Sequence, residues 1–171
     1  AQGVQVLAGG LEQAARGVGG VSFRVAMDFF EEIAKLRVAR KLWSCLLRER
    51  YGITDERAAR LRIHVVTAGS AMTYQQPLNN LVRGTLMGLA AVLGGVPSLG
   101  VSGYDEALSI PSEHAHQMSL RIQQVLAFES DLLEYDDLFN GSVVVAAKVR
   151  ELVEGARAEI ARVQAMGGAI A

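Results

Sequence analysis

Side chains that can move protons gather in and near two polar segments of the chain, residues 67–76 and 102–111. The candidates are His64, Tyr74, Tyr104, Asp105 and Glu106. Imidazole, carboxyl and phenol groups act as general acids, general bases or hydrogen-bond donors when a fold brings them around one substrate. We therefore treat these five residues as candidate catalytic groups, provided that both segments reach the same site.

The apolar pattern around the two segments predicts a strand, a helix and a second strand. A β-branched run at residues 63–66 indicates the first strand, and a second short apolar run covers residues 96–101. Between them, a helix is expected to begin after Pro77 and to end at the glycine pair 94–95. Each polar segment then follows the carboxyl end of a parallel strand, which is where α/β enzymes place their sites.

The rest of the chain predicts long helices and one further strand. The expected helices cover residues 4–18, 29–51, 112–128 and 142–166, and the expected strand covers residues 21–25. Asp28 and Glu31 form the D-x-x-E pattern of a capped helix start. The alternation predicts an α/β fold with about three parallel strands and long helices, in a single domain of residues 1–171.

Three parallel strands cannot close a barrel, because a closed barrel of this kind has eight. The two open sheet edges must then be covered by a second copy of the chain, by another subunit, or by further parts of a longer protein. Gly84 and Gly88 would allow a neighbouring helix to approach closely, and the apolar stripe of residues 36–47 needs cover. We expect these surfaces to mediate self-association into a homo-oligomer.

Charge and composition exclude several classes of protein. With 17 Lys and Arg against 18 Asp and Glu, the net charge of −1 gives no attraction for nucleic acid or an anionic membrane surface. No apolar run approaches the ~20 residues of a membrane span, and the amino end lacks the basic start of a signal peptide. Cys45 is the single cysteine, and His114 and His116 point apart on a helix, so we expect no metal site. The composition predicts a cytoplasmic protein.

Several strings in this sequence, in the same order, resemble the catalytic barrel of the cobalamin-dependent acyl-CoA mutases, the group of the methylmalonyl-CoA, isobutyryl-CoA and ethylmalonyl-CoA mutases. They are HVVTAG at 64–69, QQP at 75–77, NNLVR at 79–83, LGG at 93–95, SL at 98–99 and DEAL at 105–108, with DFFEEIAKLR upstream at 28–37. The resemblance implies the second half of a (β/α) TIM-barrel, with the cobalamin-binding domain outside this chain. It also implies an isomerase that rearranges the carbon skeleton of an acyl-CoA, with adenosylcobalamin as cofactor.

The same resemblance implies roles for individual residues. It implies that His64 lines the cavity at the cobalamin face and that Glu106 meets the ribose of the adenosyl group. The implied cofactor-binding residues are His64, Thr67, Gly69, Asn80 and Glu106, and the implied substrate-binding residues are Ser22, Gln76 and Ser98. From the residue pattern alone, His64 fits a satisfied core histidine equally well, and Glu106 fits a carboxylate that caps a helix.

Three positions depart from the family pattern, because Val66, Pro97 and Gly100 stand where the family has polar residues. The departures leave a second function open. A diverged relative without cobalamin could act as a cofactor-free enzyme on an acyl or polyketide-like substrate, or as a non-catalytic assembly partner. An apolar cavity lined by Val66, Val96, Pro97 and Val101 would suit such an acyl substrate.

Overall fold

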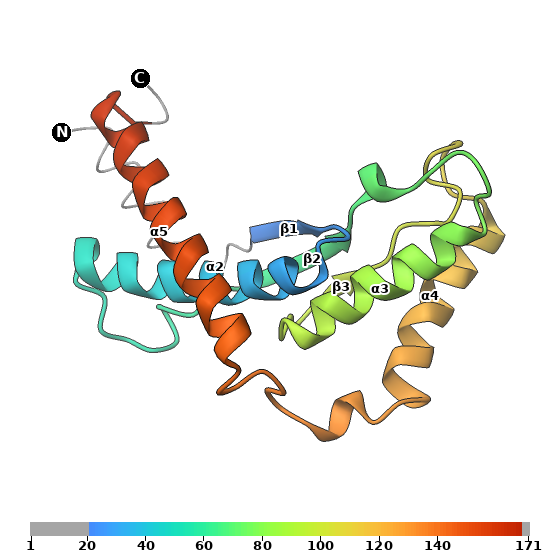
Figure 1. Ribbon diagram of the computed structural model, residues 1–171, viewed down its shortest axis with the longest axis horizontal. Helices are drawn as coiled ribbons and strands as arrows, with labels where there is room; N and C mark the ends of the chain where they lie inside the picture. The colour runs from blue at the N-terminus through green and yellow to red at the C-terminus, as the bar shows by residue number, and fades with distance from the viewer. Residues whose placement is uncertain (1–20, 169–171) are drawn as a thin grey trace.

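The computed structural model describes residues 21–168, which form a three-stranded sheet and four α-helices (Figure 1). In chain order the elements are β1 (Val21–Val25), α2 (Phe29–Tyr51), β2 (Ile63–Thr67), α3 (Asn79–Leu93), β3 (Leu99–Gly100), α4 (Glu113–Phe128) and α5 (Val143–Ala165). Two 3₁₀ turns, η1 (Gly69–Ala71) and η2 (Leu132–Glu134), follow β2 and α4. The helix expected at residues 4–18 lies outside the described residues. The expected α/β fold with parallel strands is confirmed.

The strands lie in the order β1, β2, β3, and both neighbouring pairs are parallel. Val21 pairs with Ile63 at the start of β1, and Val65 pairs with Leu99 on β3. Parallel neighbours need a crossover connection, which α2 supplies between β1 and β2 and α3 supplies between β2 and β3. All three carboxyl ends therefore reach the same edge of the sheet, as the two polar segments require.

The third strand is shorter than the apolar run at residues 96–101 predicts. It spans Leu99–Gly100 alone. Pro97 has no N–H group, so it cannot donate a ladder hydrogen bond and stays outside the strand. Contact with β2 is made just before the strand, where the Val65 N–H donates to the Ser98 carbonyl at 2.9 Å.

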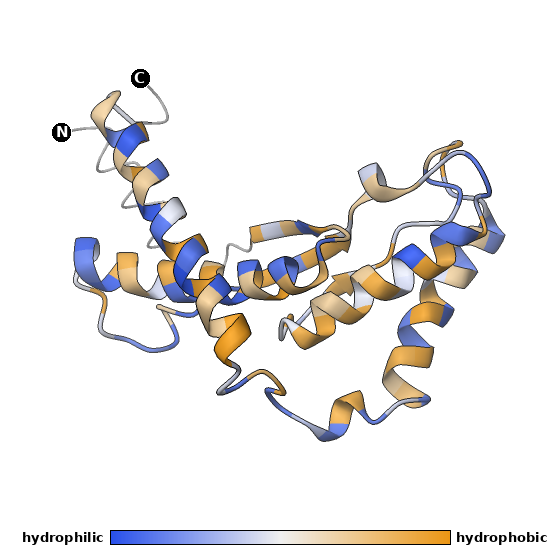
Figure 2. Cartoon of the chain, viewed as in Figure 1, coloured by the Kyte–Doolittle hydropathy of each residue, from blue (hydrophilic) through white to orange (hydrophobic). Residues whose placement is uncertain are grey.

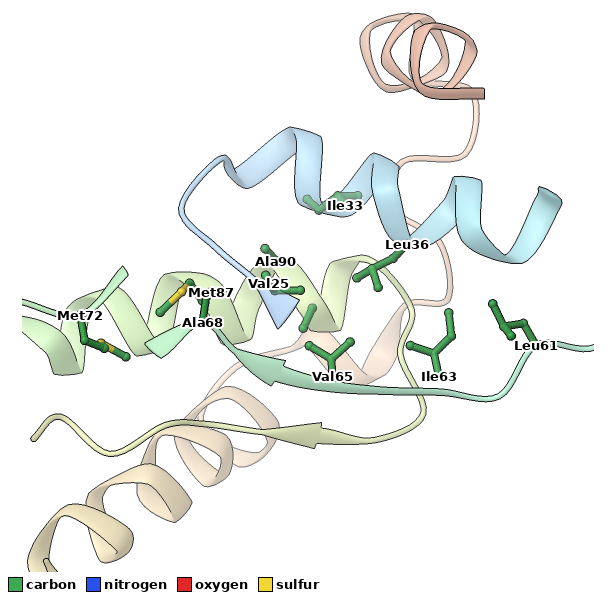
Figure 3. Close-up of a cluster of buried hydrophobic side chains, with 11 residues drawn as sticks. Val25, Ile33, Leu36, Leu61, Ile63, Val65, Ala68, Met72, Met87 and Ala90 are labelled. Atoms are coloured by element: carbon green, nitrogen blue, oxygen red, sulfur yellow. The ribbon is translucent and has the colours of Figure 1, made fainter. Parts of the chain in front are cut away.

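One face of the sheet forms the hydrophobic core together with α2 and α3 (Figure 3). Val25 and Val65 point to this face and are fully buried. They pack against Ile33 and Leu36 of α2 and against Met87 of α3. Because strand side chains alternate between the two faces, this packing decides which strand residues are left for the other face.

The opposite face of the sheet has no helix packed on it within residues 21–168. Helix α4 packs on α3, and α5 packs on α2, so both extend the helical layer instead of covering the strands. Ser22, Arg24 and His64 are exposed on this side, whereas Phe23, Val25, Ile63 and Val65 between and beside them are buried or half-buried. We call this surface the open face; its positions are Ser22, Arg24, His64, Val66, Ser98 and Gly100.

Helix ends follow local backbone chemistry, with one correction to the expected pattern. The Ser112 and Ser142 hydroxyls accept hydrogen bonds from the first turns of α4 and α5. Helix α2 ends at Gly52, whose φ of 65° is the left-handed conformation that glycine favours. The expected capping by Asp28 is wrong, because its side chain makes no cap hydrogen bond and its ψ of 69° departs from the extended conformation of a capping residue.

The surfaces expected to mediate self-association are used within the chain. Gly84 lies against α4, since a Cβ atom there would be 3.6 Å from Ile122 Cδ1. Gly88 lies similarly close to Leu126, also on α4. On α2, Leu36 is fully buried and Leu47 is 2% exposed. These features therefore contribute to helix packing within one copy, and self-association of the chain stays a prediction.

Exposed apolar side chains occur instead on the outer side of α3 and around the beginning of α5, where Figure 2 shows strong apolar colouring. The exposed residues there include Leu78, Val82, Val143 and Val144. Among the described helices, none combines the length and the apolar character that crossing a membrane would require.

Candidate functional site

A polar row crosses the open face from β1 to β3. Ser22 pairs with His64 in the parallel register, and Ser98 precedes the β3 residue that pairs with Val65. The His64 Nδ1 and Ser98 Oγ atoms are 2.8 Å apart and share a hydrogen bond. All three side chains are exposed. The structure therefore brings the histidine together with two of the expected substrate-binding residues, and it leaves the His64 side chain exposed among the described residues.

The bond to Ser98 leaves the second ring nitrogen of His64 for another partner. An imidazole engaged through Nδ1 has its orientation fixed, while Nε2 can still donate or accept one hydrogen bond. Whether Ser98 donates or accepts depends on the tautomer of the ring. If Ser98 donates to Nδ1, the Nε2–H group can donate to a carbonyl oxygen; if Ser98 accepts from Nδ1–H, the neutral ring can accept at Nε2 from a hydroxyl group.

A second row lies one step closer to the carboxyl edge of the sheet. In this row Arg24 pairs with Val66, and Val66 pairs with Gly100. Two of the positions that depart from the family pattern thus lie side by side, with one apolar side chain and one glycine. This row offers a single polar group, the guanidinium of Arg24.

The apolar cavity expected from Val66, Val96, Pro97 and Val101 is wrong. Val101 points to the helical layer, because a Cβ atom on Gly84 would lie 3.3 Å from Val101 Cγ1. Val66 belongs to the open face, on the other side of the sheet. None of five depressions on residues 21–168 is lined by these four residues together.

The carboxyl edge carries an open depression of about 430 Å³, lined by Arg24, Ala68, Gly69, Ser70 and Glu106. Glu106 lies against Gly69, since a Cβ atom on that glycine would be 3.0 Å from Glu106 Cγ. Two of the expected cofactor-binding residues are therefore neighbours. Arg24 was missed by the sequence reasoning, although its spacing of two from Ser22 indicates the same face of the strand.

Asn80 fastens the two polar segments to each other. Its Oδ1 accepts hydrogen bonds from the Thr73 N–H at 3.0 Å and from Arg83 Nη1 at 2.8 Å. Its Nδ2 donates to the carbonyls of Thr73 at 2.9 Å and Tyr104 at 2.8 Å. A side-chain amide has two donors and two acceptor positions, so this 1% exposed group is fully used. Contact with a cofactor would require breaking one of these bonds.

Thr67 makes a similar connection between the carboxyl ends of β2 and β3. Its Oγ1 accepts from the Ser102 N–H at 2.8 Å, and its carbonyl accepts from the Ser102 hydroxyl at 2.9 Å. The side chain is fully buried and continues the row of Ile63 and Val65 on the helix-covered face. The structure therefore places Thr67 behind the site, where it holds the strand ends together.

Asp105 is buried and bonded within its own loop. Its Oδ2 accepts from the Ser112 N–H at 2.9 Å. Desolvation by burial acts to raise the pKa of Asp105, but hydrogen bonds from the Ser112 backbone and hydroxyl, together with the charge of His116, hold that pKa below its ordinary value. The carboxylate is thus kept charged. Ser112 also caps α4, so Glu106 does not fill the capping role that its position allowed.

The two tyrosines and Gln76 lie apart from the polar row. Tyr74 is 68% exposed. The Tyr104 ring contacts the His114 ring edge-on, with centroids 6.0 Å apart. Gln76 has a φ of 50°, and its side-chain carbonyl accepts from Asn79 Nδ2 at 2.9 Å. None of the three has a hydrogen bond with His64 or Glu106 among the described residues, so their catalytic or binding roles stay predictions.

Acidic, histidine and cysteine side chains within residues 21–168 form no group of three that could hold a metal ion. The groups that the site does present act through hydrogen bonding and charge. His64 supplies an imidazole nitrogen, Glu106 a carboxylate and Arg24 a guanidinium, along an uncovered sheet surface of about two residue rows.

Comparison with known proteins connects this arrangement to one group of enzymes. A family model described as methylmalonyl-CoA mutase matches residues 19–171. The ethylmalonyl-CoA mutase of Cereibacter sphaeroides is 42% identical over 158 residues, which cover 90% of this chain and 24% of that protein. The 2-hydroxyisobutanoyl-CoA mutase large subunit of Aquincola tertiaricarbonis is 41% identical, over 84% of this chain and 25% of its own length.

The methylmalonyl-CoA mutase of Escherichia coli is 36% identical over 146 residues, which cover 85% of this chain and 20% of that enzyme. The chain thus spans about a quarter or less of the length of these relatives. The matched region includes all three strands and the whole open face.

Proposed function

Because the chain belongs to the methylmalonyl-CoA mutase family, we propose that it forms part of the catalytic barrel of a cobalamin-dependent acyl-CoA mutase. The reaction would be an isomerisation of the carbon skeleton of an acyl-CoA thioester. The observation that carries the proposal is the polar row of Ser22, His64 and Ser98 on the open face, with the His64–Ser98 hydrogen bond at 2.8 Å.

The sheet has the form that a segment of a (β/α) barrel requires. Parallel strands alternate with helices on one side only, so closure of the barrel would turn the open face into the interior. Strands β1 and β3 each have one unpaired edge among the described residues. The proposal is that further strands, from the rest of the protein, another subunit or a second copy, continue the sheet from these edges. Residues 1–171 would then act as one unit of the second barrel half.

In the closed barrel, His64 would orient the thioester. The bond from Ser98 to Nδ1 fixes the ring, so Nε2 can meet the thioester carbonyl oxygen without first losing rotational freedom. The hydroxyl of Ser22, next to His64 in the register, would add a hydrogen bond to the same substrate. Exclusion of water by the closed barrel would strengthen both interactions.

The residues at the carboxyl edge fit adenosylcobalamin in part. Gly100 has no side chain to obstruct the open face near this edge, and Glu106 offers an exposed carboxylate that can accept hydrogen bonds from ribose hydroxyls. His64, Gly69 and Glu106 would hold the group, whereas Asn80 and Thr67 would support the loops behind it. When bound, adenosylcobalamin supplies the hydrogen-abstracting radical of such isomerisations.

The proposal is tested on the assembled enzyme, by which we mean this chain together with the remaining barrel strands and the cobalamin-binding segment. Incubation with adenosylcobalamin and methylmalonyl-, ethylmalonyl-, 2-hydroxyisobutanoyl- or isobutyryl-CoA should give an isomer of one of them, detected by mass-matched chromatography. Omission of the cofactor is the control. A complex that shows the bound-cobalamin spectrum but converts none of the four thioesters would refute the proposal.

The second row of the open face favours an alternative. Val66 and Gly100 contribute no polar contacts there, which would suit a relative that has lost cobalamin and acts without a cofactor or as an assembly partner. A spectroscopic titration separates the two functions. Saturable cobalamin binding that weakens in His64→Ala supports the mutase, and an unchanged cobalamin spectrum at saturating enzyme supports the alternative.

A further inference from the structure

A pocket of about 680 Å³ lies between α2 and α5, in the helical layer on the side of the sheet opposite the open face (Figure 1). Neither the sequence motifs nor the mutase proposal uses it. Its volume falls within the range of about 300–1,000 Å³ that small-molecule sites occupy. Four basic side chains line it, namely Arg37, Arg40 and Lys41 of α2 and Arg150 of α5. We call it the α2–α5 pocket.

The three cations of α2 are neighbours because of their spacing. Arg40 and Lys41 follow Arg37 by three and four residues, the separations at which side chains adjoin on a helix, and like charges so placed oppose helix formation. Burial and the charge of Arg37 lower the pKa of Arg40, and the opposing effect of Asp137 is the smaller one. Positive charge in the pocket is therefore not balanced by the described protein.

Two of the four cations are engaged within the fold, and two are not. Arg37 donates to both carboxylate oxygens of Asp137 at 2.8 Å, and Arg40 donates to backbone carbonyls at the end of α3. Lys41 and Arg150 are exposed, and neither makes a hydrogen bond or an ion pair with a residue in the described part of the chain. Four cations and one paired carboxylate leave three positive charges without a counter-charge.

Carboxylates close to Arg150 on α5 do not neutralise it. Glu151, its neighbour in the sequence, forms an ion pair with Lys148 instead. Glu154 lies one turn further along the helix and forms no ion pair within residues 21–168. The guanidinium of Arg150 therefore keeps its donors for a partner in the pocket.

The wall of the pocket between the cations is apolar. Phe139, Val145 and Val149 line it, of which Val145 is buried and the other two are half-buried. Phe139 also packs against the hydrophobic core, so this part of the wall is held in place. A basic rim around an apolar wall suits a ligand that carries an organic group next to its charges.

We propose that the α2–α5 pocket binds a small organic di- or triphosphate, at a site separate from that of the acyl-CoA. A monocarboxylate would neutralise one of the three positive charges, whereas linked phosphoryl groups concentrate several negative charges and many acceptor oxygens in a small volume. Lys41 and Arg150 belong to the two helices that flank the pocket, so they can bind the phosphates from two sides. The organic part of the ligand then lies against Phe139 and Val149.

Calorimetric titration of the assembled enzyme tests the proposal, with ADP, inorganic pyrophosphate and citrate as probes in metal-free buffer. ADP should bind saturably. It should bind more tightly than pyrophosphate, because the nucleoside covers the apolar wall, and more tightly than citrate, whose charges sit on separate carboxylates. Saturating methylmalonyl-CoA should leave the dissociation constant of ADP unchanged, since the two sites lie on opposite sides of the sheet.

Two substitutions test the residues. Lys41→Gln and Arg150→Gln should each weaken ADP binding by about 3- to 10-fold, and the double variant by about 10- to 100-fold. Both side chains are exposed, so the variants should keep the circular dichroism spectrum and unfolding temperature of the unchanged protein. Arg121→Gln is the matched control, because it removes one positive charge from α4, where Arg121 bonds only Gln124. It should leave ADP binding unchanged.

Three results would each overturn the proposal of a separate phosphate site: no saturable ADP binding, an equal loss in Arg121→Gln, or displacement of ADP by methylmalonyl-CoA. Pyrophosphate or citrate that binds as tightly as ADP would overturn the assigned ligand class, since the apolar wall or the phosphoryl groups would then contribute nothing. An assembled enzyme that binds ADP as described but isomerises no thioester would refute the proposed function and leave this inference intact.

Discussion

His64 and Ser98 face each other across neighbouring parallel strands, with His64 Nδ1 and Ser98 Oγ 2.8 Å apart. The two residues are separated by 34 positions in the sequence. Helix α3, which lies between them in the chain, packs on the far side of the sheet and leaves both side chains uncovered. The fold therefore converts two distant polar residues into one site element.

Removing the Ser98 hydroxyl tests whether it positions the imidazole. Ser98→Ala should free the His64 ring and lower acyl-CoA affinity of the assembled enzyme by about 3- to 10-fold, as expected for one hydrogen bond. The Nδ1 and Nε2 nitrogen NMR shifts of His64 should change as well. Ser130→Ala, which removes a hydroxyl bonded to the Leu126 carbonyl at the end of α4, is the control. Unchanged His64 shifts would contradict the positioning role.

Asn80 should contribute mainly to stability. Asn80→Ala removes four hydrogen bonds and leaves the carbonyls of Thr73 and Tyr104 without their donor. The free energy of unfolding of the chain should fall by about 2–4 kcal/mol, the cost of leaving more than one buried polar group unsatisfied. Urea unfolding followed by circular dichroism measures this loss.

The neighbouring Asn79 provides a matched control for that measurement. It is exposed and its side chain bonds only Gln76, so Asn79→Ala should change the unfolding free energy by no more than about 0.5 kcal/mol. Equal effects of the two substitutions would show that the four Asn80 hydrogen bonds do not contribute to stability as their geometry indicates.

The lowered pKa of Asp105 predicts a loss of stability in acid. The unfolded chain has the ordinary, higher aspartate pKa, so it binds the proton first as the pH falls. The stabilisation is therefore fully present above the unfolded-state pKa of about 3.9 and is lost as the pH falls through the lower folded-state value. Asp105→Asn should flatten the stability profile below about pH 4.

The acid profile needs a control that separates Asp105 from general protonation of surface carboxylates. Asp136 is exposed on the loop before α5. Asp136→Asn should therefore lose stability with falling pH as steeply as the unchanged chain does. A profile for Asp105→Asn that runs parallel to that of the unchanged chain at every pH would argue against the hydrogen-bonded, charged carboxylate.

Much of the secondary structure follows from local signals. Helix α2 spans Phe29–Tyr51 as predicted, because 23 residues of apolar periodicity end at a glycine that takes the left-handed conformation. Strand β1 was also expected at its observed bounds. The cap at Asp28 could not be inferred in the same way, since D-x-x-E gives residue types but not the backbone angles that a cap requires.

The candidate site was harder to predict from the sequence, because it depends on which face of the sheet each side chain occupies. Val66 and Val101 both belong to apolar runs, yet they point to opposite sides of the sheet. Asn80 matched a motif, but its amide is fully used by groups that the motif does not include. Arg24 matched no motif, and its place on the open face follows only once the helices are known to cover the opposite face of the sheet.

Two glycines should respond in opposite ways to the same substitution. Gly94 ends α3 in the core, and a Cβ atom there would lie 2.6 Å from Leu36 Cδ1 and 3.1 Å from the Ala90 carbonyl oxygen. Gly94→Ala should therefore destabilise the chain by about 1–3 kcal/mol through overpacking, although its φ of −75° suits alanine. Thermal unfolding of the chain is the measurement.

Gly155 is the counterpart, in the middle of α5, where a Cβ atom would have no neighbour within 4 Å among the described residues. Gly155→Ala should stabilise the chain by about 0.5–1 kcal/mol, because alanine loses less backbone entropy in a helix. Each variant is the control for the other, since both add one methyl group to the chain. A stabilising Gly94→Ala would mean that Leu36 repacks freely, and the close contact between α2 and the end of α3 would then not be a rigid part of the core.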